Sequence, residues 1–283
     1  MTASLSPYIS QFGEEFDAGK SSHYRMTIQF SLGGFSYALL DTDTNTLIAL
    51  ECYQSNQLDS DEELISCLGS VLESKSLDSL DAHSITCLVD NRFSTFVPQP
   101  LFNEAEQAKY LEFGFQIPAN FALSSEPLST SPCVNVFALP GLLKDLLQSK
   151  WKEFRVIHTA TLFADHAMQD ETPNGAFIQV RNREFDMLIK KNGKLHFFNN
   201  FKFNTKEDFA YFLLFALEQN ELNGIDTPVS FTGLIRPASD IIDLCGRYVK
   251  ELRFAEDPHV LQVSKALKQV PFQYYFNHYQ ALR

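Results

Sequence analysis

The sequence predicts an α/β protein built from two halves in which the same order of elements occurs twice. Residues 26–90 and 175–234 each read as three strands, a helix and a further strand. The two series start about 150 residues apart, and a repeat of such long period indicates a duplication rather than a solenoid. With 283 residues, 45% hydrophobic and 20% charged, the chain can bury the cores of two ordinary domains.

The first series begins with three strands, expected at residues 26–32, 35–41 and 46–54. Gly33-Gly34 and the polar run 42–45 supply the two turns. Ser60 and Glu63 then form a capping box, which indicates the start of a helix. Its apolar face has helical spacing and consists of Leu64, Ile65, Leu68, Val71 and Leu72. The next strand is expected at residues 84–90.

The second series repeats this order, with strands expected at residues 175–181, 184–191 and 194–201. Asn192-Gly193 is a strong hairpin signal between the last two strands. Thr205 and Asp208 cap a helix whose apolar face contains Phe209, Phe212, Leu213, Ala216 and Leu217. A strand at residues 228–234 follows, and then a helix from Ser239 to Leu252 with Ile241, Ile242, Cys245, Tyr248 and Val249 on one face.

Four segments connect the two series. They are a low-complexity turn region at residues 123–132, a strand at 133–140, a helix at 141–150 and the segment 154–167. We place the boundary near residue 158, so that residues 1–158 form the first half and residues 159–283 the second.

Composition and charge exclude several classes of function. A net charge of −12 disfavours binding to nucleic acid, because the phosphate backbone repels such a surface. The five cysteines are scattered and form no CxxC pair, as expected of reduced thiols. The N-terminal stretch lacks the pattern of a signal peptide, and no apolar run reaches the roughly 20 residues of a membrane helix. We therefore expect a cytoplasmic protein without membrane insertion.

Three short motifs, taken in order, resemble those of actin-like ATPases. SLGGFS (31–36) resembles the first phosphate loop, HTATLFADHA (158–167) the connecting helix, and VSFTGLIRPASDIIDL (229–244) the adenosine motif. The repeated element order is itself similar to a duplicated ribonuclease H-like unit, the architecture of actin, hexokinase and Hsp70 chaperones. The chain most resembles an uncharacterised bacterial family of unknown function with this fold, and more distantly the actin-like proteins of pilus assembly and type II secretion. The resemblance implies two halves, each a mixed five-stranded sheet with flanking helices.

The resemblance also implies where a nucleotide would bind and which groups are missing. Active members hold Mg²⁺ with an aspartate in each phosphate loop; here those positions are Ser31 and Gln179. Arg181, Asn182 and Arg183 replace the second run of glycines, and Leu234 replaces the second glycine of the adenosine motif. The remaining cofactor-binding candidates are Ser31, Gly33, Gly34, Ser36, Arg181, Arg183 and Gly233. For Gly33-Gly34 we favour a tight hairpin over a phosphate cradle, because glycine pairs serve turns more often.

We therefore predict a catalytically degenerate actin-like protein that acts as a binding or scaffold module. It would have no catalytic residues, no metal, no required cofactor, and a protein as partner. The alternative is an enzyme or sensor that binds ATP or another anionic ligand in the cleft between the halves. In that case Gly33, Gly34 and Ser36 would contact the ligand, while Arg181 and Arg183 would supply positive charge. The sequence does not specify an oligomeric state.

Three weaker candidates have simpler explanations. Asp41, Asp43 and Asn45 resemble the start of a calcium loop, but the glycine and glutamate it needs are absent, which favours a hairpin turn. His158 and His166 could share a helix face, yet no third metal ligand lies near in sequence. The aromatic segment 272–279 is expected to close the core of the second half, with a partner-binding patch as the alternative. Nuclease chemistry is disfavoured because the expected strands lack an acidic cluster.

Overall fold

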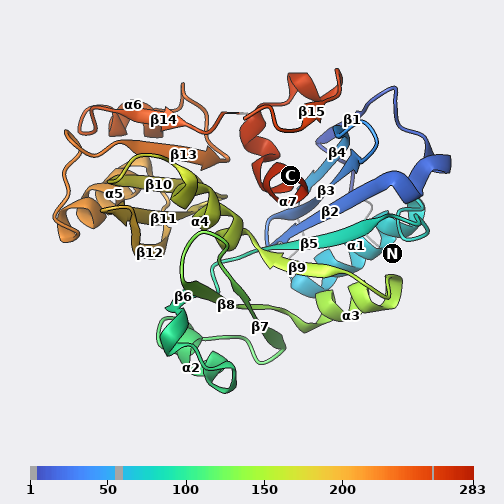
Figure 1. Ribbon diagram of the computed structural model, residues 1–283, viewed down its shortest axis with the longest axis horizontal. Coiled ribbons are helices and arrows are strands. Elements are labelled where there is room, and N and C mark those ends of the chain that lie inside the picture. Colours follow the sequence, from blue (N-terminus) through green and yellow to red (C-terminus); the bar gives the residue numbers. More distant parts are fainter. Residues whose placement is uncertain (1–4, 55–59, 257) are drawn as a thin grey trace.

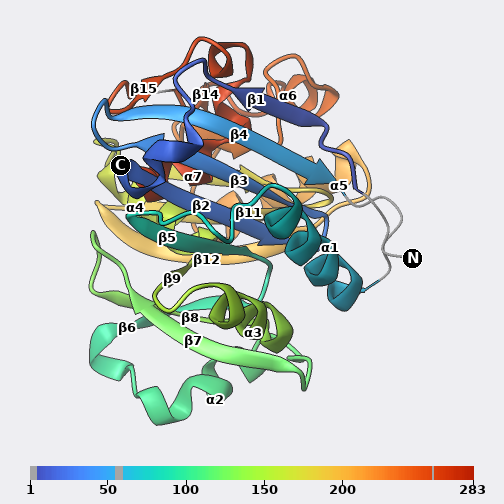
Figure 2. The same cartoon turned by 90° about the vertical axis from the view of Figure 1, so that its right-hand side faces the viewer.

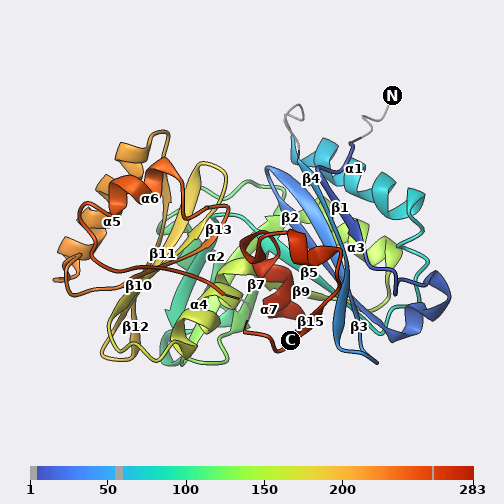
Figure 3. The same cartoon turned by 90° about the horizontal axis from the view of Figure 1, so that it is seen from above.

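The computed structural model describes residues 5–54, 60–256 and 258–283. Residues 1–4, part of the stretch in which no signal peptide was predicted, lie outside these ranges. Figure 1 shows two large sheets at the right and upper left, with helices α4 (Thr159–Gln169) and α7 (Phe276–Leu282) between them. A small unit with a third sheet lies below them, and Figure 3 shows the same two helices between the sheets from above.

The first sheet contains the first predicted series. Its strand order is β1-β4-β3-β2-β5-β9. Strand β15 also pairs with β4 and lies outside this order. The bounds are β1 (Ile9–Phe12), β2 (Tyr24–Ser31), β3 (Gly34–Asp41), β4 (Thr46–Gln54), β5 (Ser84–Asp90), β9 (Arg155–His158) and β15 (Gln262–Val263). Strands β2, β3 and β4 are antiparallel, whereas β5 and β9 run parallel to β2. The four predicted strands are confirmed, and β1, β9 and β15 complete the sheet.

Two helices, α1 (Asp61–Ser74) and α3 (Gly141–Lys150), cover the face of the first sheet away from α7 (Figure 2). The N-cap of α1 is Ser60, whose side chain accepts a hydrogen bond from the backbone N–H of Glu63. Alternate residues of β2 point to this face, and Leu68 and Leu72 of α1 are fully buried against them. The predicted apolar face of α1 is therefore its core face.

The second sheet contains the second series in the order β12-β11-β10-β13-β14. The bounds are β10 (Gly175–Val180), β11 (Glu184–Lys191), β12 (Lys194–Lys202), β13 (Val229–Gly233) and β14 (Leu252–Phe254), with helices α5 (Lys206–Gln219) and α6 (Asp240–Cys245). Asn192 and Gly193 both have positive φ, as a hairpin turn of this kind requires. Thr205 and Asp208 form the predicted capping box at the start of α5.

The predicted helix 239–252 is wrong in its second part. Helix α6 ends at Cys245, the chain turns at Gly246, and residues 252–254 add β14 in parallel to β13. Tyr248, assigned by spacing to the buried face, is 54% exposed. Gly246 ends the helix with a φ of −63°, and a turn in which Val249 N–H donates to the carbonyl of Cys245 still buries Val249 beside α6, so the predicted face is wrong at Tyr248 but not at Val249.

The third sheet, in the order β6-β8-β7, lies below the first two. It comprises β6 (Ser94–Pro98), β7 (Phe121–Pro127) and β8 (Cys133–Pro140), and helix α2 (Gln107–Glu112) packs on it. The predicted turn region 123–132 is wrong over residues 123–127, which belong to β7. Pairing with β8 overrides the turn-like composition of this segment, as tertiary context often does. Short 3₁₀ helices connect the elements at Ala18–His23, Gln99–Leu101, Glu104–Glu106, Leu267–Gln269 and Phe272–Tyr274.

The C-terminal segment returns to the first sheet, which contradicts its predicted place in the core of the second half. Strand β15 pairs with β4, and α7 contacts β2, β3 and β5. Leu261, Leu267, Tyr275, Tyr279 and Leu282 pack with residues of β3 and β4 in one buried cluster. The division into residues 1–158 and 159–283 stays a prediction; β9 ends at His158 and α4 begins at Thr159.

Candidate functional site

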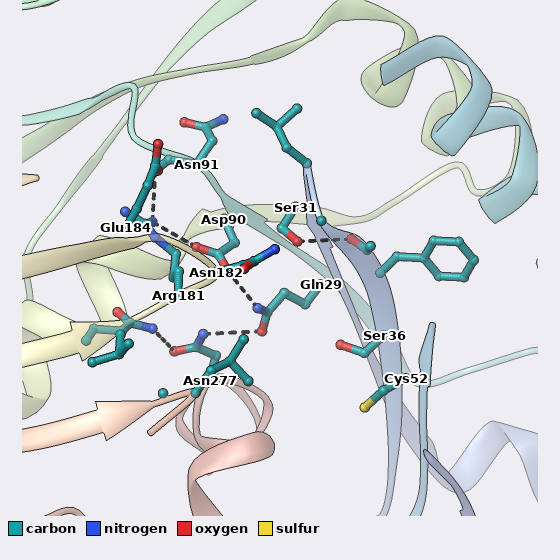
Figure 4. Close-up of a pocket in the computed structure, with 18 of the residues that line it drawn as sticks. Gln29, Ser31, Ser36, Cys52, Asp90, Asn91, Arg181, Asn182, Glu184 and Asn277 are labelled. Atoms are coloured by element: carbon teal, nitrogen blue, oxygen red, sulfur yellow. Dashed lines mark hydrogen bonds and ion pairs between the residues drawn. The ribbon is translucent and has the colours of Figure 1, made fainter. Parts of the chain in front are cut away.

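A cavity of about 760 Å³ opens between the first and second sheets. The β2–β3 hairpin and the end of β5 line one side, the β10–β11 turn and the end of β13 line the other, and the start of α7 forms part of the wall. Figure 4 shows polar side chains from these elements pointing toward one another. Parallel strands end here in both sheets, and such strand ends are where open α/β sheets bind ligands.

Arg181, in the β10–β11 turn, joins the two sides of the cavity. Its Nη1 lies 2.9 Å from Asp90 Oδ1 at the end of β5, and its Nη2 lies 2.6 Å from Asp186 Oδ1 in β11. Nη1 also donates to the carbonyl of Asn91 at 3.1 Å. The side chains of Arg181, Asp90 and Asp186 are only 10%, 8% and 3% exposed. Burial alone would lower the pKa of Arg181, but the carboxylates of Asp186 and Asp90 raise it, so the guanidinium stays charged.

Asn277, in α7, forms a second link across the cavity. It accepts a hydrogen bond from Gln179 Nε2 at 2.8 Å and donates one to Gln29 Oε1 at 3.2 Å. Gln29 in turn donates to Asp90 Oδ2 at 3.0 Å, so an unbroken chain of hydrogen bonds runs from β5 to β10 (Figure 4). Gln29 lies opposite Ser36 in the first sheet and Gln179 lies opposite Asp186 in the second. The two glutamines therefore occupy corresponding positions of the two halves.

The β2–β3 hairpin contributes the predicted residues Ser31, Gly33, Gly34 and Ser36, all of which line the cavity. Ser31 Oγ donates to the carbonyl of Gly34 at 3.1 Å, and Ser36 Oγ lies 2.8 Å from His278 Nε2. Gly34 has a φ of +147°, and a Cβ there would lie 2.0 Å from the carbonyl oxygen of Tyr53. A Cβ on Gly33 would meet nothing closer than 4.0 Å. The turn and its sheet neighbour thus require glycine at 34 and tolerate a side chain at 33.

The second half contributes Arg181 and Gly233 to the cavity, whereas Arg183 does not line it. Arg183 is exposed at the tip of the β10–β11 turn with a φ of 59°. Gly233 has a φ of 83°, and a Cβ there would lie 2.2 Å from the carbonyl oxygen of Val180. Leu234 follows it, lines the cavity and is 49% exposed. Six of the seven candidate residues thus come together, while their role in binding a cofactor stays a prediction.

The two large sheets have corresponding topology and meet at a cavity formed by their strand ends. This chain belongs to the family described as protein of unknown function (DUF3822). The family model matches residues 13–252. A Bacteroides thetaiotaomicron protein with actin-like ATPase fold and unknown function is similar, with 17% identity and a TM-score of 0.80 over 94% of this chain and 98% of that one. The predicted resemblance is confirmed.

A chain of the PilM–PilN type IV pilus biogenesis complex has the same fold at larger distance. The identity is 10% and the TM-score is 0.56, over 91% of this chain and 96% of that one. Curated proteins give no match. This DUF3822 protein therefore has the actin-like ATPase fold, with β1 and β15 added to the first sheet and the β6-β8-β7 unit placed between β5 and β9.

Sequence reasoning missed the polar residues that hold this site together. Asp90 ends the predicted strand 84–90, and an acid at the end of a parallel strand was a usable signal. Asp186 was used only to align the second loop, although it lies opposite Gln179. Asn277 could not be found, because its segment had been assigned to the core of the second half.

The weaker candidates are structural in this DUF3822 protein. Asp41 accepts from the backbone N–H of Asp43 within the β3–β4 turn. His158 caps α4 by accepting from the N–H of Ala160, and burial lowers its pKa to about 3, with Arg181 adding to the effect. Burial lowers the pKa of His166 to about 4 in the same way. Within the described ranges no three His, Cys, Asp or Glu side chains gather as a metal site.

No helix in the described ranges has both the length and the apolar character needed to cross a membrane.

Proposed function

We propose that this protein is a binding module of actin-like fold that does not hydrolyse nucleotide. The observation that carries the proposal is the position of Arg181 between Asp90 and Asp186. The two buried carboxylates come from different sheets, and the single guanidinium pairs with both of them.

Electrostatics disfavours a divalent cation at this position. A second cation beside a buried guanidinium would be repelled, and displacing Arg181 would break two buried ion pairs. Asp90 Oδ1 already accepts from Arg181 and Thr159, and Oδ2 accepts from Gln29. Ser31 stands where the resemblance places the first metal-holding aspartate, and by strand register the corresponding position of the second hairpin is Arg181 rather than the expected Gln179. Hydrolysis that depends on Mg²⁺ thus lacks its anchors.

A binding role agrees with the internal links across the cavity. The Arg181 ion pairs and the Gln29–Asn277–Gln179 hydrogen bonds hold the halves together without a ligand. The fold also occurs in the PilM–PilN type IV pilus biogenesis complex, whose name describes a protein assembly. A rigid body of this kind would suit a protein that presents fixed surfaces to a partner.

The test is phosphate release from ATP by the purified protein, with and without Mg²⁺. We expect no turnover above that of buffer, in wild type and equally in Ser31→Asp. Ser31→Asp restores only one of the two aspartates that would hold the metal, so this variant should stay inactive. Robust Mg²⁺-dependent turnover by the wild type would overturn the proposal.

A second candidate function, binding of a small anionic ligand, is favoured by the cavity itself. Two buried polar atoms at its wall, Gln179 Oε1 and Arg181 Nε, have no hydrogen-bond partner. Buried polar groups are normally paired; the N–H of Arg181 Nε is a donor that suits an anion, whereas Gln179 Oε1 would need a donor from the ligand. Gly33 offers a probe of this function, because it lines the cavity and has room for a side chain.

The probe is ATP, with thermal unfolding as the readout. A ligand at a hundred times its dissociation constant stabilises the native state by about 2.7 kcal/mol and raises the midpoint by several degrees. Binding in the cavity would give this shift in wild type and in the neutral variant Gly33→Asn, but not in Gly33→Asp, whose carboxylate repels the anion. No shift in wild type, or an equal shift in all three, would reject the cavity as the ATP site.

A further inference from the structure

A second hollow, of about 530 Å³, adjoins the cavity between the two sheets and shares Arg92 and Lys202 with it. One wall is the end of β12, at Phe198–Lys202, and the other is the third sheet with the loop after α2. Both sheets present an edge here: in the described part of the chain β12 pairs with β11 alone and β6 with β8 alone, and β6 packs beside β12 without joining its ladder. Figure 1 shows β6 next to β12, and the Phe96 and Phe198 rings, with centroids 4.6 Å apart, join the two walls. We call this hollow the edge groove.

The backbone of β12 turns the hydrogen-bonding groups of alternate residues to its outer side. Phe203 N donates to Arg183 O, and the two residues lie directly opposite, so they form a hydrogen-bonded pair of the antiparallel ladder. Such pairs alternate along the ladder, which turns the backbone groups of Phe198, Asn200 and Lys202 away from β11. Consistently, the N–H of Asn200 is taken by the side chain of Asn199 rather than by β11. These three residues line the edge groove.

The groove combines apolar rings with positive charge. Phe113, at its rim, is 97% exposed, and Tyr110 and Phe115 line it with Phe198. An exposed ring of this size next to a groove is typical of an interaction site. Arg92 and Lys202 are the charged residues that line the groove in the described part of the chain. Lys202 lies 3.7 Å from Glu184 Oε1 in an exposed ion pair, and together with Arg92 it forms a modestly basic site on a protein whose net charge is −12.

We propose that an extended acidic segment of a protein partner binds in the edge groove as an added strand beside β12. Its backbone would pair with Phe198, Lys202 and the carbonyl of Asn200, whose N–H already donates to Asn199 Oδ1, as peptides do when they extend the edge of a sheet. One row of its side chains would pack on Phe113 and Phe198, and a carboxylate would reach Arg92 and Lys202. The proposal rests on the binding role above and names its surface and the chemistry of its partner.

Charge decides between this occupant and a second copy of the chain. The β12 strand of another copy would bring its own lysines to Arg92 and Lys202, and like charges repel. An acidic segment gains from the same two groups. A long unpaired strand edge promotes aggregation unless it is covered or charged. The charge of Lys202 protects this edge, and a bound strand would cover it.

The probe is a random library of nine-residue peptides displayed on phage, matched in length to β12. We expect the selected peptides to be acidic and free of proline, and their binding to weaken about tenfold at high salt. In the complex, the backbone amides of Phe198, Asn200 and Lys202 should become protected from hydrogen exchange. Selected peptides that are basic, or that protect other amides, would overturn the proposal.

Three variants separate the edge groove from the rest of the surface. Lys202→Pro removes an outward N–H without touching the ladder to β11, and edge strands tolerate proline there. Lys202→Glu reverses the charge in the groove, and Lys194→Glu makes the same change on the same strand outside it. The first two should weaken peptide binding by about tenfold or more, whereas Lys194→Glu should leave it unchanged. Equal binding by all three would reject the groove.

The remaining outcomes separate this inference from the proposed function. Peptides that bind elsewhere would leave the binding role intact and reject only the edge groove. Turnover of ATP would reject the proposed function whatever the peptides do. Protection of the β12 amides that grows with protein concentration, in the absence of peptide, would assign the groove to a second copy and overturn the acidic partner.

Discussion

Arg181 Nη1 and Asp90 Oδ1 lie 2.9 Å apart and join the two sheets at the point where both sets of parallel strands end. The same guanidinium bonds Asp186 through its other terminal nitrogen. A positive side chain thus occupies the space between two buried carboxylates, and the protein supplies its own counter-charge. Any loss of Arg181 leaves negative charge buried on both sides of the cleft.

Replacing Arg181 by alanine should therefore cost about 3–5 kcal/mol of unfolding free energy, as measured by urea titration. The matched control is Arg183→Ala, two residues along the same turn, where the side chain is exposed and the cost should stay within about 0.5 kcal/mol. Adding Asp186→Asn to Arg181→Ala should recover part of the loss. Equal effects of the two arginine variants would contradict the structural role of Arg181.

The two glycines of the β2–β3 hairpin should respond differently to alanine. At Gly34 the added Cβ would lie 2.0 Å from a backbone oxygen of β4, so strands must move apart and stability should fall by several kcal/mol. At Gly33 the space is open, and Gly33→Ala should change stability by less than about 1 kcal/mol. Thermal unfolding of the two variants checks this. A larger loss at 33 than at 34 would show that the hairpin has another geometry.

Buried histidines should make the protein sensitive to acid. His278 contacts Thr27 Oγ1 and Ser36 Oγ, and burial lowers its pKa to about 3. In the unfolded chain His278 binds a proton at about pH 6.5, whereas burial keeps it neutral in the native state until the pH approaches 3. The contribution of each such histidine to the free energy of unfolding is therefore constant above pH 6.5 and falls as the pH drops from 6.5 toward 3, by roughly 1.4 kcal/mol per pH unit.

The variant His278→Gln isolates this contribution. Its stability curve should run parallel to that of the wild type above pH 6.5 and fall less steeply below it, as urea titrations at several pH values would measure. Asp186 acts in the opposite direction, because burial raises its pKa to about 6, but it is present in both proteins and cancels in the comparison. Identical slopes below pH 6.5 would mean that His278 is protonated in the native state.

The C-terminal helix should be essential to the core of the first half. Tyr279 is fully buried under the first sheet, and its hydroxyl accepts from the N–H groups of Val260 and Leu261. Tyr279→Ala should cost about 3–5 kcal/mol and unfold the first sheet, whose amides would lose protection from hydrogen exchange. Tyr248→Ala, at a position 54% exposed, is the control and should have little effect. Loss of protection confined to the second sheet would contradict this placement.

Local signals predicted the strands and helices that lie next to one another in the chain. The β2–β3–β4 and β10–β11–β12 meanders followed from alternation and from turns such as Asn192-Gly193, because hairpins are local structures. The return of residues 262–282 to the first sheet was not predictable, since long-range pairing leaves no periodic signal. Helix α6 was overextended because Val249 continues its apolar spacing past Gly246.

The sequence predicted the residues of the candidate site that lie in its loops. It did not predict the polar residues that form hydrogen bonds and ion pairs across the site. Ser31, Gly33, Gly34, Ser36, Arg181 and Gly233 line one cavity because loops at corresponding positions of the two halves meet there. The partners of Arg181 lie about 91 and 5 residues away, and nothing in the sequence relates Asp90 to Arg181. Asn277 joins glutamines from both halves and could be recognised only once α7 was placed.

The path of the chain also has a consequence for biosynthesis. Strand β15 and helix α7 cover a face of the first sheet that residues 24–54 built much earlier on the ribosome. Until residues 262–282 emerge, that face exposes the apolar side chains of Ala38, Leu40, Leu47 and Leu50. The nascent first sheet would thus be a client for chaperones, and the second sheet, whose last strand ends at Phe254, would finish folding before it.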